Sequence, residues 1–314
     1  MQNLALVAQQ VAVLFALMGV GACCRRLKWI GDDAVKGMVN VLVLVVTPCL
    51  VVEAFQRPFE TSLMRQLVLA FLVVAAAHAV AIALACLFIR GGRAETRGVL
   101  RVAAAFGNAG FMGLPLEAAI LGPEGVFFGI VYIAVFNLFI WSWGLMQIRG
   151  SSLRSMSRAE IVKALFNPGF VGLALGLPLF CLSVNLPGVV REPVHMLAEL
   201  NTPLAMIVIG FYLAGARIRP LFGNVSAYLS AFVRLVVFPL AVIALMYPFK
   251  AQLLPGLMIA VAIAASAPAA ALNSMFAAKY GKDVDTAVGI VSGTTLLSIL
   301  TMPPMIALAM EVLK

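Results

Sequence analysis

The chain has 314 residues, of which 63% are hydrophobic and only 11% are charged. Soluble domains carry about 25% charged residues, so this composition excludes a water-soluble globular protein and indicates a protein of the lipid bilayer. The formal net charge of +9 would suggest nucleic-acid binding in a soluble chain, but membrane proteins retain basic residues in their cytoplasmic loops. Ten spans of about 20 residues would use roughly two thirds of the chain, which leaves no room for a soluble catalytic domain.

Stretches without Asp, Glu, Lys or Arg predict the membrane spans. Seven of them are strong candidates, and most are long enough to cross the hydrocarbon core. Three further candidates are shorter or interrupted, one by Glu117 and one by Arg234. We therefore predict ten transmembrane helices. The seven stretches are residues 1–24, 37–52, 66–89, 125–148, 164–190, 251–278 and 286–310, and the other three are 102–121, 200–216 and 224–249.

The distribution of basic residues predicts the orientation. The first stretch has no basic segment before it and no cleavage pattern after it, so we expect a retained first span. In a ten-helix arrangement, sixteen Lys and Arg fall in odd-numbered loops and five in even-numbered loops or at the termini, which with Arg234 accounts for all 22. The positive-inside rule then predicts a multi-pass protein of the plasma (inner) membrane with both termini outside, in the periplasm.

The two halves of the chain resemble each other. The dipeptide Thr-Pro at 47–48 recurs at 202–203, and Gly122 and Gly281 follow the fourth and ninth spans at a similar offset. This near-constant offset predicts a duplication, although chance matching in apolar sequence accounts for part of it. Because each half has an odd number of crossings, the repeat must be inverted, as in secondary transporters. The predicted parts are a first five-helix repeat (1–148), a short cytoplasmic linker (149–163) and a second five-helix repeat (164–314).

Helices 4 and 9 each contain helix breakers. FGNAGFMGLP (106–115) holds three glycines before Pro115, and ASAPAAALNS (265–274) holds Pro268. Unpaired backbone in hydrocarbon costs several kcal/mol per group, so such breaks survive only in protein or beside a wet cavity. The free N–H groups of a restarting half-helix attract anions. We therefore predict that the two breaks meet mid-membrane and hold a carboxylate; close helix packing is the alternative for either motif alone.

The segments GNAGFMGLPLEAAILGPEG (107–125) and SAPAAALNSMFAAKYGKDVDTAVGIVSGTTLLSILTMPP (266–304) resemble the auxin efflux carrier family in its bacterial form, which includes malonate and malate permeases. The similarity extends over nearly the whole chain, including NVLVLVVTPCL (40–50) and NPGFVGLALGLPL (167–179). The resemblance implies an all-α membrane protein of ten helices in two inverted five-helix repeats. It also implies a scaffold domain, a transport domain with broken crossover helices 4 and 9, an elevator-like motion and often a homodimer.

Polar and helix-breaking residues at the breaks and on neighbouring helices form the predicted substrate site. Within the resemblance, Asn108 and Pro115 match the first crossover segment and Pro268 the second. Thr294 and Ser298 share one face of helix 10, where hydroxyl bonds to the helix's own carbonyls are the alternative. The predicted substrate-binding residues are Asn108, Gly110, Pro115, Ser266, Pro268, Asn273, Thr47, Asn137, Thr294 and Ser298.

Ionisable residues inside predicted spans are candidates for ion coupling. Glu117 and His78 are the predicted proton-coupling residues; a solvated helix end and a hydrogen-bonded packing histidine are the respective alternatives. Arg234 is expected to pair with Glu199 or Glu53, or with backbone carbonyls. The five cysteines and two histidines lack metal-ligand spacing, so we expect no metal site and no cofactor.

We predict a secondary active transporter of a small organic anion, either a mono- or a dicarboxylate, that works by elevator-type alternating access. A sodium-coupled symporter of the bile-acid type is the alternative, although residues 251–278 offer no carboxylate for the cation. A channel or a membrane receptor ranks below both. The chain has no HExxH, GxSxG or P-loop motif, so we expect no enzyme. The expected partners are the anion, a proton or sodium ion, lipid and a second copy in a homodimer, without nucleic acid.

Overall fold

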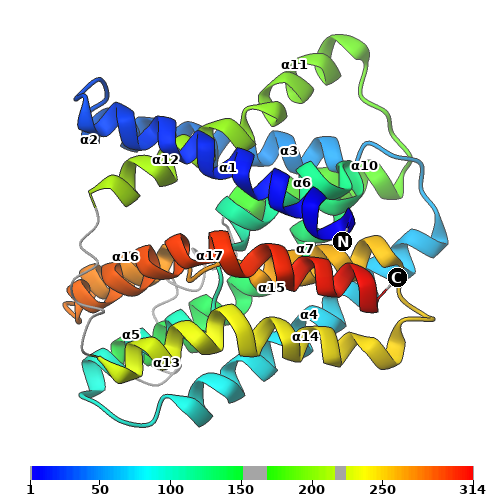
Figure 1. The fold of residues 1–314 in the computed structure, drawn as a ribbon. Helices are drawn as coiled ribbons and strands as arrows, with labels where there is room; N and C mark the ends of the chain where they lie inside the picture. Colours follow the sequence, from blue (N-terminus) through cyan, green and yellow to red (C-terminus); the bar gives the residue numbers. More distant parts are fainter. Residues whose placement is uncertain (1, 151–167, 216–223, 314) are drawn as a thin grey trace.

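A computed structural model describes residues 2–150, 168–215 and 224–313, and every regular element in these ranges is a helix (Figure 1). Seven of these helices are long and apolar enough to cross a membrane. Three shorter apolar helices accompany them, so the protein is a helical, multi-pass membrane protein. The seven are Leu4–Arg26, Asp32–Ala54, Thr61–Phe88, Pro123–Arg149, Gly188–Ala214, Val225–Phe249 and Val284–Val312, and the shorter ones are Ala109–Leu121, Val171–Cys181 and Pro255–Ser266.

The first half of the chain contains five runs of helix within the described residues. Several runs include a short π-helical turn, written η, which widens the helix by one residue per turn and often marks a functional site. The elements are α1 (Gln2–Arg26); α2 (Asp32–Val41), η1 (Leu42–Val46) and α3 (Thr47–Ala54); α4 (Thr61–Phe88); α5 (Ala94–Ala105), η2 (Ala109–Gly113) and α6 (Leu114–Leu121); and α7 (Pro123–Phe139), η3 (Ile140–Gly144) and α8 (Leu145–Arg149).

The second half follows a similar order from residue 168 onward. The elements are α10 (Pro168–Cys181); α11 (Gly188–Glu199) and α12 (Asn201–Ala214); α13 (Val225–Phe232), η6 (Val233–Val237), α14 (Phe238–Met246) and the 3₁₀ turn η7 (Tyr247–Phe249); α15 (Pro255–Ser266) and α16 (Leu272–Lys279); and α17 (Val284–Val312). The predicted linker lies outside the described residues from 151 onward, as do the first residues of the predicted sixth span.

Two predicted span boundaries are wrong. The uncharged stretch 164–190 predicted one helix, but α10 ends at Cys181 and α11 begins at Gly188. The seventh span therefore begins well before the predicted residue 200. The prediction started the seventh span after the charged residues. Arg191 nevertheless lies within α11, where it forms an ion pair with Glu53 of α3 at 3.5 Å. Such a pair lets a helix carry charge at the end of a span.

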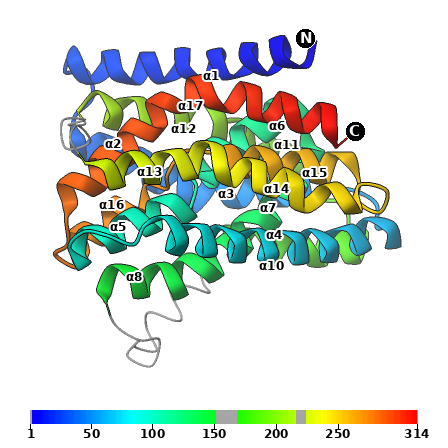
Figure 2. The same ribbon diagram turned by 60° about the horizontal axis from the view of Figure 1, so that its bottom comes forward.

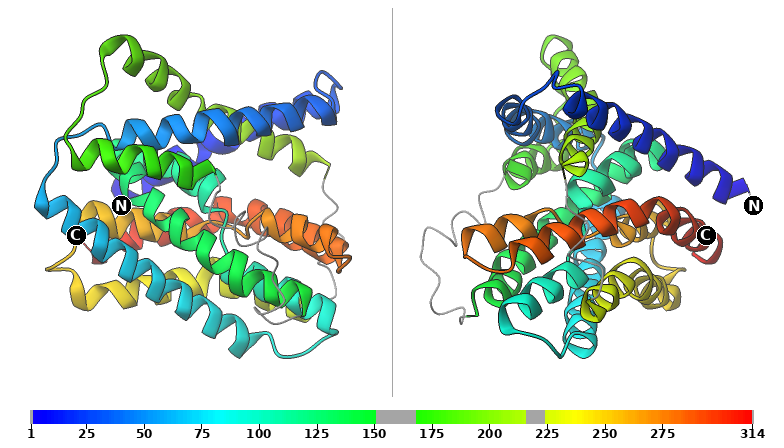
Figure 3. Two further views of the ribbon diagram at one scale, coloured as in Figure 1. Left: turned by 180° about the vertical axis from the view of Figure 1, so that it is seen from behind. Right: turned by 60° about the vertical axis from the view of Figure 1, so that its left-hand side comes forward.

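The helices form two groups that pack against each other. The first group contains α1, α2–α3, α10 and α11–α12, and the second contains α4–α8 and α13–α17 (Figures 1 and 3). The groups meet where α1 packs against α17 and α6, α3 against α7, and α12 against η2. Figure 2 shows α1 at the edge of the bundle with α17 beside it. The break in helix 4 therefore lies close to the boundary between the two groups.

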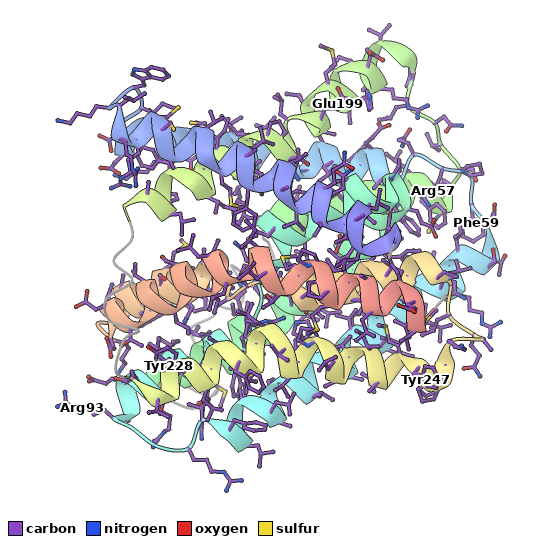
Figure 4. The ribbon with its side chains drawn as sticks, in the orientation of Figure 1. Arg57, Phe59, Arg93, Glu199, Tyr228 and Tyr247 are labelled. Atoms are coloured by element: carbon purple, nitrogen blue, oxygen red, sulfur yellow. The ribbon has the colours of Figure 1, made fainter. Side chains whose placement is uncertain are left out.

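Aromatic side chains mark the two ends of the bundle. Tyr228 and Tyr247 are half exposed, at 50% and 52%, and lie at opposite ends of the α13–α14 run (Figure 4). Arg93 lies at the same end of the bundle as Tyr228, whereas Arg57 and Phe59 lie at the same end as Tyr247. Amphipathic aromatic rings and basic residues are typical of the two membrane–water interfaces. The positions of these side chains fit a bilayer that crosses the helices between the two levels.

Asp283, at the same end of the bundle as Arg93, connects α5 to α17 in the second group. Asp283 caps α17 by accepting from the Thr286 N–H at 3.0 Å, and it also accepts from the Thr96 hydroxyl on α5 at 2.7 Å. Partial burial raises the pKa of the Asp283 carboxyl, but the hydrogen bonds from Thr286 and Thr96 outweigh it and hold that pKa below its ordinary value. The start of α5 and the connection from α16 to α17 are thereby fixed to each other.

Within the first group, α1 and α12 approach each other through two glycines. A Cβ atom at Gly21 would overlap the backbone of Ile207, and one at Gly210 would overlap the backbone of Met18. Small residues of this kind let membrane helices pack backbone against backbone. The two helices are therefore in direct backbone contact.

We expect Gly210→Ala to destabilise the protein by about 1–3 kcal/mol, because the added methyl group forces the two backbones apart. Gly19→Ala is the matched control, since nothing lies within 4 Å of a Cβ at Gly19. The melting temperature of the purified protein in detergent measures both. Equal melting temperatures for the two variants would show that α1 and α12 do not pack in this way.

Candidate functional site

The structure places a break at each predicted motif. Helix 4 stops at Ala105 and restarts at Ala109, and helix 9 stops at Ser266 and restarts at Leu272. Between the halves the backbone is extended, with φ −115° and ψ 120° at Phe106 and φ −62° and ψ 145° at Ala267. Proline disfavours the helical conformation in the residue before it, so Pro268 accounts for the extended Ala267.

The two breaks bind each other. Gly107 and Ala269 form an isolated antiparallel bridge, in which the Asn108 N–H donates to the Pro268 carbonyl at 2.7 Å. The Ala270 N–H donates to the Phe106 carbonyl at 2.9 Å. In Figure 1, α5 and α16 lie toward one end of the bundle and α6 and α15 toward the other, so the broken helices run in opposite directions. We call residues 106–108 and 267–271 the crossover.

A threonine on α17 binds one further freed amide. The Thr294 hydroxyl accepts from the Ala269 N–H at 3.1 Å and donates to the Ile290 carbonyl at 2.7 Å. Thr294 therefore supports the crossover and bonds its own helix at the same time. The Ser266 hydroxyl, by contrast, donates only to Ala262, one turn earlier, at 2.7 Å.

The broken helices also share one arginine. Arg234 on η6 is fully buried, and its guanidinium donates to the Ala105 carbonyl at 3.1 Å and to the Ala265 carbonyl. These carbonyls belong to the last turns of α5 and α15, where helix carbonyls lack partners and carry partial negative charge. Of the predicted partners for Arg234, the backbone carbonyls are confirmed; Glu53 instead pairs with Arg191.

Gly107 lets the arginine approach the bridge. A Cβ atom there would lie 3.1 Å from Nη2 of Arg234 and 3.1 Å from the Ala267 carbonyl oxygen, tighter than ordinary contacts. On its other side the guanidinium lies over the Phe238 ring, 4.4 Å from its centroid. The arginine thus fits between the bridge and a ring face that favours cations.

The restarting halves lie nearer the surface than the ending halves. Ala105 and Ser266 are both 1% exposed, whereas Gly110 and Ala271 are partly exposed. No described residue accepts from the N–H groups of Ala109, Gly110, Phe111, Ala271 or Leu272. Both helix N-termini at the crossover therefore offer free amide donors, which suit an anion.

Asn108 stands directly before the first of these amides. Its carbonyl accepts from Met112 at 2.9 Å, while its side-chain amide bonds no described residue although Asn108 is only 7% exposed. The amide atoms are not fully enclosed, so they are open to water or a ligand. Asn108 is thus the predicted site residue that is best placed to touch a ligand.

Several predicted site residues use their polar atoms within the protein. Asn273 is buried and donates from Nδ2 to the Val99 carbonyl of α5 at 3.1 Å, which joins α16 to α5. Pro115 is the second residue of α6 and has no backbone N–H to donate. Thr47, Asn137 and Ser298 donate to Leu42, Ile133 and Thr295 of their own helices, at 2.8, 2.8 and 2.7 Å. The role of these residues in binding stays a prediction.

Glu117 is buried, contrary to the solvated alternative. It is 1% exposed, and its carboxyl group lies so close to Gly129 of α7 that a Cβ there would overlap it. A Cβ at Gly113 would lie 3.5 Å from Ala264 of α15 and 3.6 Å from Oε1 of Glu117, which places this carboxyl among three helices. Oε2 has no hydrogen-bond partner. The lack of a side chain at Gly129 thus makes room for a carboxyl group in the core.

His78 on α4 is also buried and sits among aromatic rings. Its Nδ1 lies 2.9 Å from the Val74 carbonyl, one turn earlier. The imidazole stacks on Phe139 at 5.4 Å and contacts Tyr132 at 5.0 Å between centroids. Nε2 of His78 and the hydroxyl of Tyr132 are both buried without a hydrogen-bond partner.

One polar residue near Arg234 gave no signal in the sequence. Tyr132 interacts electrostatically with both Arg234 and Glu117, and a tyrosine in an apolar span gives no distinct pattern. Elsewhere, Asn201 at the start of α12 is 4% exposed and its Nδ2 has no partner. Among the described residues, no group of three His, Cys, Asp or Glu side chains is arranged to hold a metal ion.

Two crossed, broken helices in a bundle of apolar spans define the architecture of a membrane transporter. Residues 6–306 match the family described as Membrane transport protein. The chain therefore belongs to this family, that of the auxin efflux carriers, as its motifs predicted. An uncharacterized transporter from Methanothermobacter thermautotrophicus (strain Delta H) is 28% identical over 304 residues, which cover 94% of this chain and 96% of that protein.

We expect Gly107→Ala to destabilise the protein by about 1–3 kcal/mol, because the methyl group must displace Arg234 or open the bridge. The control is Gly37→Ala, since a Cβ at Gly37 meets nothing within 4 Å. Melting temperature reports stability, and uptake into proteoliposomes reports function. A Gly107→Ala protein as stable and active as the control would contradict the contact with Arg234.

Proposed function

We propose that this transporter is a secondary active carrier of a small organic anion, a mono- or dicarboxylate, which binds at the crossover. The proposal rests on the pair of oppositely directed half-helices whose free N–H groups lie partly exposed beside Asn108. Two such termini hold a carboxylate without a lysine or arginine in direct contact, because each carries partial positive charge. The match to the transport family supports a carrier rather than a receptor.

We also propose ten spans in two inverted repeats, 1–148 and 164–314, joined by the linker 149–163. Seven long and three short apolar helices in the described residues support this count. The opposite directions of the two broken helices support the inversion. In this proposal the first helix group is the scaffold and the second carries the crossover, so sliding of the second group moves the bound anion across the membrane.

The proposed setting is the inner membrane, with both termini on the periplasmic side. The two ends of the described chain lie at the same end of the bundle in Figure 1, which supports placing the termini together. The excess of basic residues in the odd loops supports the choice of side. A homodimer rests on the family resemblance alone.

For coupling we propose a proton carried by Glu117. The carboxyl group is buried among three helices, and no described basic side chain forms an ion pair with it. An isolated carboxylate in a membrane interior is costly, so the group crosses the membrane more cheaply as the neutral acid. His78 is the second candidate; its ring is enclosed by aromatic residues and already bonded through Nδ1.

We expect Asn108→Ala to lose most transport, on the order of tenfold or more, while the protein stays folded, because a donor to the anion is lost. Asn40→Ala is the matched control, since Asn40 is exposed on α2. Substrate-saturable counterflow in proteoliposomes measures transport, and size-exclusion profiles report folding. Normal counterflow by Asn108→Ala would remove Asn108 from the site, and conductance without counterflow would favour a channel.

We expect Glu117→Gln to abolish uptake driven by a pH gradient while leaving exchange of anions intact, because a permanently neutral side chain cannot release a proton. Glu192→Gln, at an exposed position on α11, is the control. Uptake is driven separately by pH and sodium gradients. Uptake that follows only the sodium gradient would favour the bile-acid-type alternative, and pH-driven uptake by Glu117→Gln would exclude Glu117 as the proton carrier.

A further inference from the structure

The charges around the crossover are unequal on its two sides. Each helix end carries about half an elementary charge, positive at the N-terminus and negative at the C-terminus. The ends of α5 and α15 together contribute about −1, and the starts of Ala109–Leu121 and α16 together contribute about +1. Without other charges, the crossover is therefore neutral as a whole.

Arg234 changes this balance. Its guanidinium bonds the last turns of both α5 and α15, so its single positive charge offsets the two negative helix ends. Among the described residues no carboxylate lies within ion-pair distance of Arg234, and its Nε is buried without a partner. The two N-terminal ends consequently remain uncompensated, with a total of about +1.

The other polar groups around the crossover do not offset this charge. His78 is bonded to a backbone carbonyl through Nδ1 and is neutral when it holds one proton, and Tyr132 is a phenol. Glu117 contributes no charge when it carries its proton, as in the proposed function. The unpartnered amide of Asn108, which is 7% exposed, lies beside the free N–H groups and has no charge of its own.

We propose that the crossover selects singly charged organic anions, and that Arg234 is the residue that sets this valence. The inference rests on the proposed function, because it takes the crossover as the substrate site and Glu117 as protonated in the loaded carrier. One negative charge then makes the loaded site neutral, so it crosses the membrane without a net charge. A dianion leaves about one uncompensated negative charge in the membrane interior, which desolvation penalises.

Arg234 is a positioning residue in this scheme, since it acts through the helix ends and not by touching the anion. Its guanidinium has a fixed planar geometry that reaches two carbonyls at once. A lysine keeps the positive charge but lacks the planar guanidinium that reaches both carbonyls, and a glutamine removes the charge. These two substitutions therefore separate the charge from the shape of the side chain.

The first test uses the wild-type protein and three dicarboxylates, malonate, succinate and malate, each paired with its monomethyl ester. The shift in melting temperature gives the apparent affinity, because a bound ligand stabilises the folded state by mass action. At neutral pH we expect each monoester to bind at least about tenfold more tightly than the dianion of the parent acid. At a pH where the dicarboxylate is itself a monoanion, we expect the difference to disappear. Dianions that bind as tightly as their esters at neutral pH would overturn the inference.

The second test compares Arg234→Gln, Arg234→Lys and the control Arg191→Gln, an arginine paired with Glu53 at the end of α11. By the same charge balance, the site without the arginine charge is neutral when empty. We expect Arg234→Gln to bind the monoesters at least about tenfold more weakly and to lose the preference of the wild-type protein for a monoester over the uncharged dimethyl ester of the same acid. Arg234→Lys and Arg191→Gln should keep that preference. A preference for the monoester over the dimethyl ester that survives in Arg234→Gln would show that Arg234 is only structural. If Arg234→Gln does not fold, loss of that preference in Arg234→Lys together with a preference for dianions in the wild-type protein would still overturn the inference.

The outcomes separate this inference from the proposed function. Binding and counterflow of organic anions without any preference for single charge leave the carrier function standing and reject the role of Arg234. The absence of both binding and counterflow for every acid and ester would reject the carrier function itself.

Discussion

The structure depends on one constraint, which is that backbone N–H and C=O groups cannot be left unpaired in hydrocarbon. Two helices nevertheless break in the middle of the bundle, at residues 106–108 and 267–271. They are tolerated because each break supplies partners for the other, with Asn108 bonding Pro268 and Ala270 bonding Phe106. Neither break is satisfied alone, so the two helices must cross where they do.

The side chains around the crossover follow from the same constraint. Thr294 accepts the Ala269 amide, and Arg234 bonds the last carbonyls of both ending helices. A buried arginine is costly in a membrane, and here the two negative helix ends compensate it. The guanidinium lies so close to residue 107 that glycine, which has no Cβ, fits there best. The ending halves are thereby closed, while the restarting halves keep free N–H groups near the surface.

This asymmetry connects the fold to the proposed transport. The proposed site consists of main-chain amides and one side-chain amide, so no charged residue needs to touch the substrate. It lies beside η2, which packs against α12 of the first helix group, so the proposed sliding of the groups acts directly on it. The backbone contact of α1 and α12 through Gly21 and Gly210 fits the scaffold role proposed for the first group.

The sequence by itself determined the membrane class, the family and the positions of both breaks, because charge depletion and runs of glycine and proline act locally along the chain. It misplaced the start of the seventh span, since the ion pair between Arg191 and Glu53 joins segments far apart in sequence. Only the tertiary structure chose carbonyls as the partners of Arg234, buried Glu117 and turned Asn273 toward Val99. Those outcomes depend on which helices become neighbours, and apolar spans of similar composition do not encode their neighbours in any local pattern.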